Sequence, residues 1–339
     1  MEWTRSRRWP ARWGTCLPID NHPSAEWKFQ LTECCIYTKG ESHETRLHRS
    51  GRADHRASKG LGKGIALEFA RRGAAVVLVA RSAGPLEQLA KQIRLLGGQA
   101  LAVPTDVTSP QEVSAVVSKT MDRFGRIDVL VNNAGIAKVG PVESSTFAED
   151  ARQTMQASLF GAISLTQQVL PIMRRQGSGT VVNMSSVMGR KAIARFGSYG
   201  LVMHAMSGFS DALRQELAGT KIKVSVIYPA LTATTLLEEV DEADMPPAFR
   251  YLTPLTVDEV SRAVVTAVRR GKRRVVIPRI VTLLLVTEAI SSRVADLFLT
   301  GLARYRWFGW AVGLSRGKTY HQSISPSPAS AGHHRVHVG

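Results

Sequence analysis

The chain has 339 residues, of which 44% are hydrophobic, and it carries a formal net charge of +17. A chain of this length and composition can bury one large core, which favours a single globular domain. Residues 1–56 hold ten basic and seven acidic side chains, and residues 301–339 hold five basic and no acidic ones, so nearly half of the excess charge lies at the two ends. No nucleic-acid-binding module accompanies the charge, and we expect no nucleic-acid partner.

The positions of the cysteines and of the apolar segments indicate in which cellular compartment the protein is expected to lie. All three cysteines lie in the first 35 residues, which fits a reducing compartment such as the cytoplasm. Residues 1–30 lack the apolar core of a secretory signal, and residues 280–290 are too few to cross a bilayer. Residues 269–300 join a basic run to an apolar one and could touch a membrane surface, although a helix packed on its own domain or on a subunit neighbour is the simpler interpretation.

From Leu61 onward, apolar strands alternate with helical segments. Unbroken apolar strands that alternate with helices are typical of a parallel sheet buried on both faces. The pattern therefore predicts an α/β fold with a doubly wound parallel sheet in one domain. The predicted helices cover residues 61–72, 85–96, 112–124, 151–175, 199–217 and 260–270, and the predicted strands cover residues 75–80, 100–103, 129–131, 180–184, 224–228 and 275–278.

The two ends of the chain do not follow this alternation. Residues 1–56 show neither helical nor strand periodicity, and the last residues are rich in Ser, Pro, His and Gly. We predict an atypical extension over residues 1–56 that is disordered or misread, a domain over residues 57–300, and a basic disordered tail over residues 301–339.

Three short motifs occur in the order that a dinucleotide site requires. Residues 57–62 read Ala-Ser-Lys-Gly-Leu-Gly, and glycines at a helix start let a pyrophosphate approach the backbone. Asp106-Val107 follows one predicted strand, and residues 132–135, Asn-Asn-Ala-Gly, follow the next. Alone, the first motif is equally compatible with an ordinary helix start, and each of the others with a surface turn. Chance does not readily produce all three in this order.

Tyr199 lies thirteen residues after Ser186, and both follow the strand predicted at residues 180–184. Together with the three motifs, this spacing resembles the short-chain dehydrogenase/reductase family over residues 57–300. The resemblance implies a Rossmann-like fold, a nicotinamide cofactor, proton transfer by Tyr199 and a hydrogen bond from Ser186 to the substrate oxygen. The cofactor-binding residues that it implies are Ser58, Lys59, Gly60, Leu61, Gly62, Arg81, Asp106, Val107, Asn132, Asn133, Ala134, Gly135, Tyr199, Pro229 and Thr234.

Two substitutions alter the catalytic motif of the family. Met203 stands where the family has a lysine, and Ser158 stands where it has an asparagine that holds a water in the proton relay. A cation about 5 Å from the phenol, at an effective dielectric constant of about 20, is worth roughly 3 kcal/mol or about two pKa units. Either Tyr199, Ser186, Ser158 and Met203 form a slow active site that Arg190, Lys191 or Arg195 assists, or the chain is a catalytically dead member from a decayed or misread gene.

The first strand of the fold is also altered. Family members have a strand ending in Thr-Gly before the alanine that corresponds to Ala57, whereas residues 53–56 here read Ala-Asp-His-Arg. Codons for these four residues, read one base later, can encode Leu-Ile-Thr-Gly. We therefore hypothesise that residues 1–56 come from a shifted reading frame, and we expect the first strand to be lost or replaced.

The charge of Arg81 and the family resemblance predict which cofactor and which partners the protein binds. Arg81 ends the second predicted strand, where an acid would bind ribose hydroxyls, so NADP(H) is preferred over NAD(H), unless Arg81 is simply a solvated charge. Residues 236–255 are largely apolar, which favours a small hydrophobic substrate such as an alcohol, a ketone, a steroid or another lipid. The resemblance implies a homodimer or homotetramer through residues 151–175 and 199–217. No metal site is expected.

Overall fold

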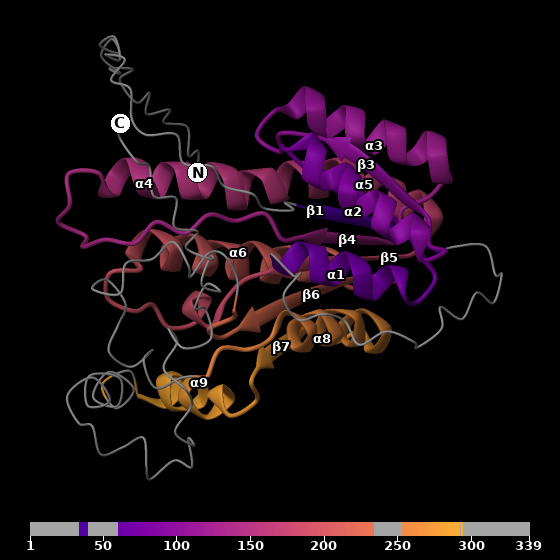
Figure 1. Ribbon diagram of the computed structural model, residues 1–339. Coiled ribbons are helices and arrows are strands. Elements are labelled where there is room, and N and C mark those ends of the chain that lie inside the picture. Colours follow the sequence, from indigo (N-terminus) through magenta and orange to yellow (C-terminus); the bar gives the residue numbers. More distant parts are fainter. Residues whose placement is uncertain (1–33, 40–59, 234–252, 292, 294–339) are drawn as a thin grey trace, which may run out of the picture. The chain divides into compact units, whose positions relative to one another are not determined.

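A computed structural model describes residues 34–39, 60–233, 253–291 and 293 (Figure 1). Its core is a seven-stranded sheet with the order β3-β2-β1-β4-β5-β6-β7. All strands run parallel except β1, which is antiparallel to both of its neighbours. The strands are β1 Cys34–Lys39, β2 Ala74–Ala80, β3 Ala100–Pro104, β4 Val129–Asn132, β5 Gly179–Met184, β6 Ile222–Pro229 and β7 Arg274–Ile277.

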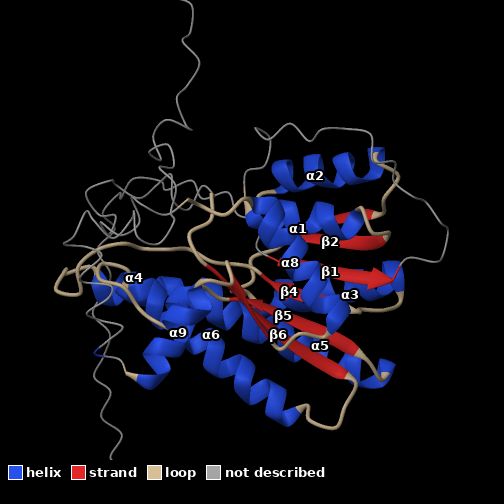
Figure 2. Cartoon of the chain, turned by 90° about the horizontal axis from the view of Figure 1, so that it is seen from below, coloured by secondary structure: helices blue, strands red, loops and turns tan. Residues whose placement is uncertain are grey.

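Helices cover both faces of the sheet (Figure 2). One face packs against α1 Leu61–Ala70, α2 Ala83–Leu95 and α8 Val257–Arg270. The other packs against α3 Pro110–Phe124, α5 Gly161–Gln176 and α6 Gly197–Glu216. Successive strand residues enter opposite clusters, because side chains alternate across a strand. The predicted doubly wound α/β fold is confirmed.

The helix predicted over residues 151–175 contains an irregular turn. It consists of α4 Phe147–Thr154, the π-helical turn η1 Met155–Phe160, and α5. A π turn widens the helix locally and often marks a functional position. Ser158, one of the candidate site residues, lies inside this turn and is fully buried.

Several helices begin at capping residues that the sequence provides. Ser109 accepts a hydrogen bond from the Glu112 backbone N–H at 3.3 Å at the start of α3. At the start of α8, Thr256 and Glu259 cap each other's backbone N–H groups in a capping box. Such caps satisfy amides that have no partner within the helix, so these boundaries are encoded locally.

Strand β1 lies within residues 1–56 and takes the place of the first strand, which the sequence predicted to be lost or replaced. Ile36 is buried in one core cluster, and Tyr37 is buried in the other, where it stacks on Phe69 at a ring-centroid distance of 3.8 Å. Ile, Tyr and Thr have good strand propensity. A six-residue strand carries little periodicity, and the sequence reasoning sought the strand immediately before the glycine loop.

The direction of β1 changes how the chain reaches the glycine loop. Cys34 pairs with Val79 and Asn132, and Lys39 pairs with Ala74. Strand β1 therefore begins at the carboxyl edge of the parallel strands and ends at their amino edge. Helix α1 begins at the carboxyl edge, and residues 40–59 between the two elements lie outside the described ranges. The direct strand-turn-helix connection of a dinucleotide fold is thus replaced in this chain.

Candidate active site

Ser186 and Tyr199 come together at the carboxyl edge of the sheet. Ser186 lies two residues after the end of β5 and caps the short 3-10 helix η2 Val187–Gly189, where its Oγ accepts from the Met188 backbone N–H at 3.2 Å. Tyr199 lies in the first turn of α6. The side chains of Ser186 and Tyr199 are hydrogen-bonded to each other. The Ser186 hydroxyl also lies 3.4 Å from the Pro229 carbonyl at the end of β6.

The phenol of Tyr199 holds its proton tightly. Burial raises the pKa of Tyr199 to about 12, and the hydrogen bond from Ser186 offsets part of this rise. No charged group within the described ranges contributes to the shift. Lys191 forms an ion pair with Glu288 at 2.9 Å, and the Arg190 and Arg195 residues are exposed. None of these three basic residues contributes to the pKa shift of Tyr199.

Met203 lies one turn after Tyr199 on α6 and is buried. Its side chain belongs to an apolar cluster with Leu159 and Met206, against which Tyr199 packs. Its carbonyl accepts hydrogen bonds from the hydroxyls of Ser185 and Ser207, each at 3.0 Å. The helix backbone at this position is thus held firmly, while the side chain supplies no charge to the phenol.

The hydroxyl of Ser158 has no hydrogen-bond partner in the described part of the chain, although Ser158 is fully buried. It faces the Asn-Asn-Ala-Gly segment, since a Cβ on Gly135 would lie 3.6 Å from its Oγ. A buried hydroxyl without a partner costs free energy. The position therefore suits a water molecule or a polar group of a ligand.

The start of α1 forms a cradle open to an anion. Gly60 has a φ of 95° and caps the helix without a side-chain hydrogen bond, and the first turn, which contains Leu61 and Gly62, has no acidic residue. A Cβ on Gly60 would meet no atom within 4 Å. Backbone N–H groups at such a helix start bind phosphate, so the cradle fits a dinucleotide. The candidates Ser58, Lys59 and Thr234 lie outside the described ranges.

The remaining nucleotide candidates follow neighbouring strands. Arg81 directly follows β2 and is exposed. Asp106 and Val107 follow β3, and the Asp106 carboxylate accepts from the Thr108 backbone N–H at 2.9 Å and from its hydroxyl at 2.7 Å. Val107 packs against the backbone of Gly161, where a Cβ would lie 2.6 Å from Val107 Cγ2. This contact fixes the turn after β3 against α5.

A buried polar network supports the Asn-Asn-Ala-Gly segment. The Asn132 amide donates to Asn183 Oδ1 at 2.8 Å and to the Thr166 hydroxyl at 3.2 Å. The Asn183 amide in turn donates to the Ser210 hydroxyl at 2.8 Å. The network joins β4, β5, α5 and α6 beneath Ala134. Sequence reasoning did not identify Asn183 or Ser210, although an asparagine inside the apolar strand of residues 180–184 was a signal.

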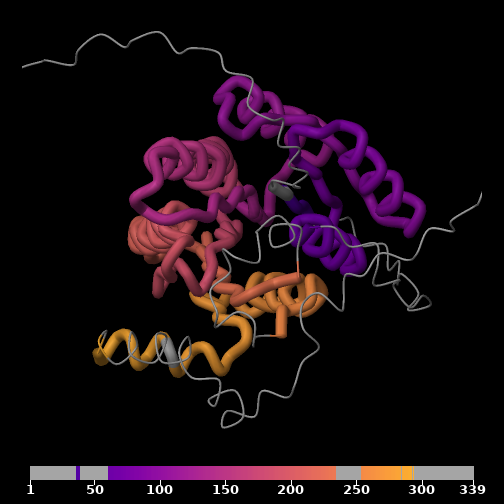
Figure 3. Tube along the Cα trace, turned by 60° about the vertical axis from the view of Figure 1, so that its left-hand side comes forward, coloured from indigo at the N-terminus to yellow at the C-terminus, as the bar shows by residue number. Residues whose placement is uncertain are grey.

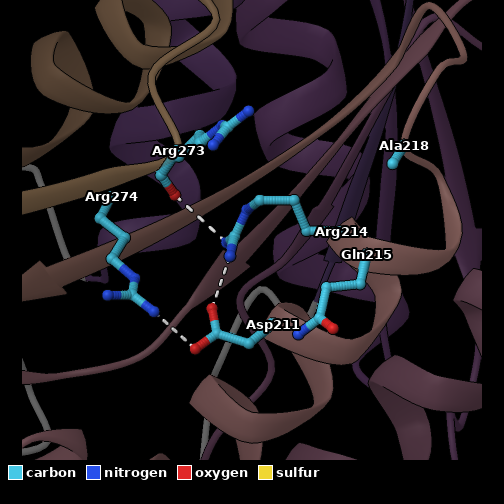
Figure 4. Close-up of a pocket in the computed structure, with 6 residues that line it drawn as sticks. All are labelled: Asp211, Arg214, Gln215, Ala218, Arg273 and Arg274. Atoms are coloured by element: carbon cyan, nitrogen blue, oxygen red, sulfur yellow. Dashed lines mark hydrogen bonds and ion pairs between the residues drawn. The ribbon is translucent and has the colours of Figure 1, made fainter.

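A polar cavity of about 330 Å³ lies at the opposite edge of the sheet (Figure 4). Asp211 on α6 binds Arg214 at 2.5 Å and Arg274, the first residue of β7, at 2.6 Å. No candidate catalytic residue lines it. The lining residues are Asp211, Arg214, Gln215, Ala218, Arg273 and Arg274.

Among the described residues, no group of His, Cys, Asp or Glu side chains could hold a metal ion.

Comparison with known proteins agrees with this geometry. The family model for short chain dehydrogenases matches residues 56–245. The chain is 34% identical over 257 residues to the ketoacyl reductase HetN of Nostoc sp., covering 75% of this chain and 87% of that protein. It is also 34% identical over 232 residues to 11-beta-hydroxysteroid dehydrogenase A of Sesamum indicum, covering 66% of each.

A solved structure resembles the fold as well. It is a 7 alpha-hydroxysteroid dehydrogenase in complex with NADH and 7-oxo glycochenodeoxycholic acid, with a TM-score of 0.58 and 26% sequence identity. The match covers 64% of this chain and 88% of that one. Within the described ranges, none of the helices has the length and apolarity needed to span a membrane.

Proposed function

Because the chain belongs to the short-chain dehydrogenase family of NAD(P)-dependent oxidoreductases, we propose that it interconverts a hydrophobic ketone and the corresponding alcohol. The observation that carries the proposal is the hydrogen-bonded pair of Ser186 and Tyr199 at the carboxyl edge of the sheet. Relatives named for ketoacyl and hydroxysteroid substrates support an apolar substrate, of the steroid or lipid kind.

In the direction of reduction, the Ser186 hydroxyl donates a hydrogen bond to the carbonyl oxygen of the substrate and holds it beside Tyr199. The nicotinamide, when bound, supplies a hydride to the carbonyl carbon. Tyr199 donates its phenolic proton to the carbonyl oxygen and regains a proton from solvent. With a pKa of about 12, Tyr199 is almost fully protonated near neutral pH, so it serves better as the acid of reduction than as the base of oxidation.

The residues that would hold the dinucleotide lie along the same edge. The open N-terminus of α1 at Gly60 would bind the pyrophosphate. Arg81, which follows β2 where an acid would repel a 2′-phosphate, would accept one, so we propose a preference for NADP(H), with NAD(H) as the second choice. Asp106 and Val107 would contact the adenine ring. The segment from Asn133 to Gly135, with Pro229 and Thr234, would line the nicotinamide side.

Assembly as a homodimer or homotetramer is part of the proposal. Helices α4 and α6 pack side by side (Figure 3). Phe160 in η1 and Leu201 on α6 are large apolar residues that remain exposed, which supports burial of these helices against another copy. The confinement of the cysteines to the first 35 residues supports a cytoplasmic location.

The alternative is a family member with impaired or no catalysis. It is supported by Met203, which leaves the Tyr199 phenol without a neighbouring cation among the described residues. Cofactor binding without turnover is the expected behaviour of such a protein.

Oxidation of NADPH and NADH in the presence of a panel of ketones tests the proposal. We expect ketone-dependent oxidation, faster with NADPH, and a loss of at least about a hundredfold in Tyr199→Phe. Tyr228→Phe is the matched control, since Tyr228 is buried in β6 and its hydroxyl has no partner within the described structure. Binding of cofactor without oxidation for any ketone would favour the alternative, and an unchanged rate in Tyr199→Phe would contradict the proposed proton donor.

A further inference from the structure

Helix α9, Val281–Ile290, presents an apolar face to solvent. Ile280, Leu283, Val286 and Ile290 are between 50% and 82% exposed. Their spacing of three, three and four residues places them on one side of the helix, which we call the α9 stripe. Several large apolar side chains exposed together on one helix are unusual for a surface that only water contacts.

The opposite side of α9 is attached to the domain. Glu288, the acid of this helix, forms an ion pair with Lys191 at 2.9 Å. A position two residues after Val286 points well away from the stripe, because each residue turns the helix by about 100°. Figure 3 shows α9 at the margin of the fold, beyond β7. The ion pair thus holds α9 with its stripe facing outward.

The charges around the stripe are basic. Arg279 and Arg293, at the two ends of the helix, are exposed, as is Arg190 next to Lys191. The sequence that follows, residues 294–316, combines aromatic residues with arginines and contains one acid, Asp296. Basic residues beside an apolar helical face are typical of segments that lie in a membrane interface.

We propose that the α9 stripe docks on an anionic lipid surface. Arginines at both ends would meet lipid headgroups while the stripe enters the acyl boundary. A second copy fits less well, since antiparallel pairing of two α9 helices would bring Arg279 of one copy near Arg293 of the other. Residues 294–316 of the same chain also fit less well as a cover, because they carry the same sign of charge.

The position of α9 links this surface to the candidate active site. Lys191, which holds α9, lies five residues after Ser186. In a further step that rests on the proposed function, docking would bring the candidate active site close to the lipid from which an apolar substrate would enter. The docking itself requires neither cofactor nor turnover.

Sedimentation of the full chain with vesicles tests the proposal directly. We expect binding to phosphatidylcholine vesicles that contain phosphatidylglycerol, at least about tenfold tighter than to phosphatidylcholine alone, and weakened by salt. The double variant Leu283→Gln with Val286→Gln should bind at least about tenfold more weakly. Arg279→Gln should bind about fivefold more weakly. The matched control is Leu95→Gln, which removes an exposed leucine from the end of α2 and should bind as the native chain does.

Results that differ from these expectations would overturn the proposal. Absence of vesicle binding, or equal loss in Leu95→Gln, would show that the stripe does not dock on lipid. A lower melting temperature or a dissociated oligomer in the double variant, without vesicle binding, would identify the stripe as a protein contact. Ketone turnover measured without vesicles is independent of these results, so failure of the docking and failure of the proposed activity are distinguishable.

Discussion

Tyr199 and Met203 lie one helical turn apart on α6, with Ser186 opposite the phenol. Burial raises the pKa of the phenol to about 12, and the hydrogen bond with Ser186 offsets part of this rise. In a member with lysine at position 203, a cation would favour the phenolate. We infer that this chain retains the geometry of the proton donor and lacks the group that makes the same phenol an effective base.

Replacing Ser186 with alanine tests the hydrogen bond at the residue scale. Ser186→Ala removes the group that offsets the effect of burial on Tyr199 and that would hold the substrate oxygen. We expect ketone reduction to fall between about tenfold and a thousandfold. Ser261→Ala is a control, because Ser261 is buried on α8 and bonds within its own helix. Equal rates for native chain and Ser186→Ala would exclude this role.

The family resemblance implied that Ser186 and Tyr199 serve one site, and in the structure their side chains share a hydrogen bond. It did not predict the network of Asn132, Asn183 and Ser210, because the partners come from three different elements. Nor did it reveal that the Ser158 hydroxyl, which lies in the π turn, has no hydrogen-bond partner among the described residues.

At the scale of elements, β1 departs most from what the sequence predicted. It occupies the centre of the sheet with reversed direction, and both of its faces are covered. The other strands were predicted because their apolar runs alternate with helical segments. Strand β1 was not, because local propensity in Cys34–Lys39 does not specify which neighbours the strand joins.

Truncation of Ile36 measures how much β1 contributes to stability. Ile36 is fully buried, so Ile36→Ala should lower the free energy of unfolding by about 2 to 5 kcal/mol. Leu95→Ala, at an exposed position, should change it by no more than about 0.5 kcal/mol. Chemical denaturation gives both values. An unchanged stability in Ile36→Ala would mean that another segment fills the centre of the sheet.

Asp211 on α6 pairs with Arg214 on the same helix and with Arg274 on β7, and the second pair joins the two elements (Figure 4). Burial opposes ionisation of Asp211, but the hydrogen bond from Arg214 and the charges of Arg214 and Arg274 outweigh it, so the pKa is lowered. Because the side chains are partly solvated, we expect Asp211→Asn to cost only about 1 kcal/mol.

The pH dependence of this cost has a defined sign. A lowered pKa in the folded state gives stability that is present above the unfolded value of about 3.9 and is lost as pH falls through the folded value. The difference in unfolding free energy between native chain and Asp211→Asn should therefore shrink below about pH 4. A difference that stays constant down to about pH 2 would contradict the ion pair.

At the scale of the whole molecule, the two core clusters and the sheet bring Gly60, Arg81, Asn133 and Tyr199 to one edge. The sequence predicted this arrangement because the carboxyl ends of parallel strands meet at the same edge. It did not predict the direction of β1, which is antiparallel to both of its neighbours.

Cofactor preference is expected to appear as a difference in thermal stability. A ligand at about a hundred times its dissociation constant stabilises the folded state by about 2.7 kcal/mol. We expect NADPH to raise the melting temperature more than NADH at equal concentration, and Arg81→Gln to remove most of the difference. Lys119→Gln, at an exposed position on α3, should keep it. A larger shift with NADH in the native chain would contradict the proposed preference.

The pH dependence of alcohol oxidation tests most directly whether Tyr199 carries the proton in a site without a cation. At saturating cofactor, the native rate should rise about tenfold per pH unit until the pH approaches the Tyr199 pKa of about 12, as should that of Met203→Leu. Met203→Lys should level off about two pH units earlier and be faster below that point. A native profile that levels off near neutral pH, or one that Met203→Lys leaves unchanged, would contradict the account.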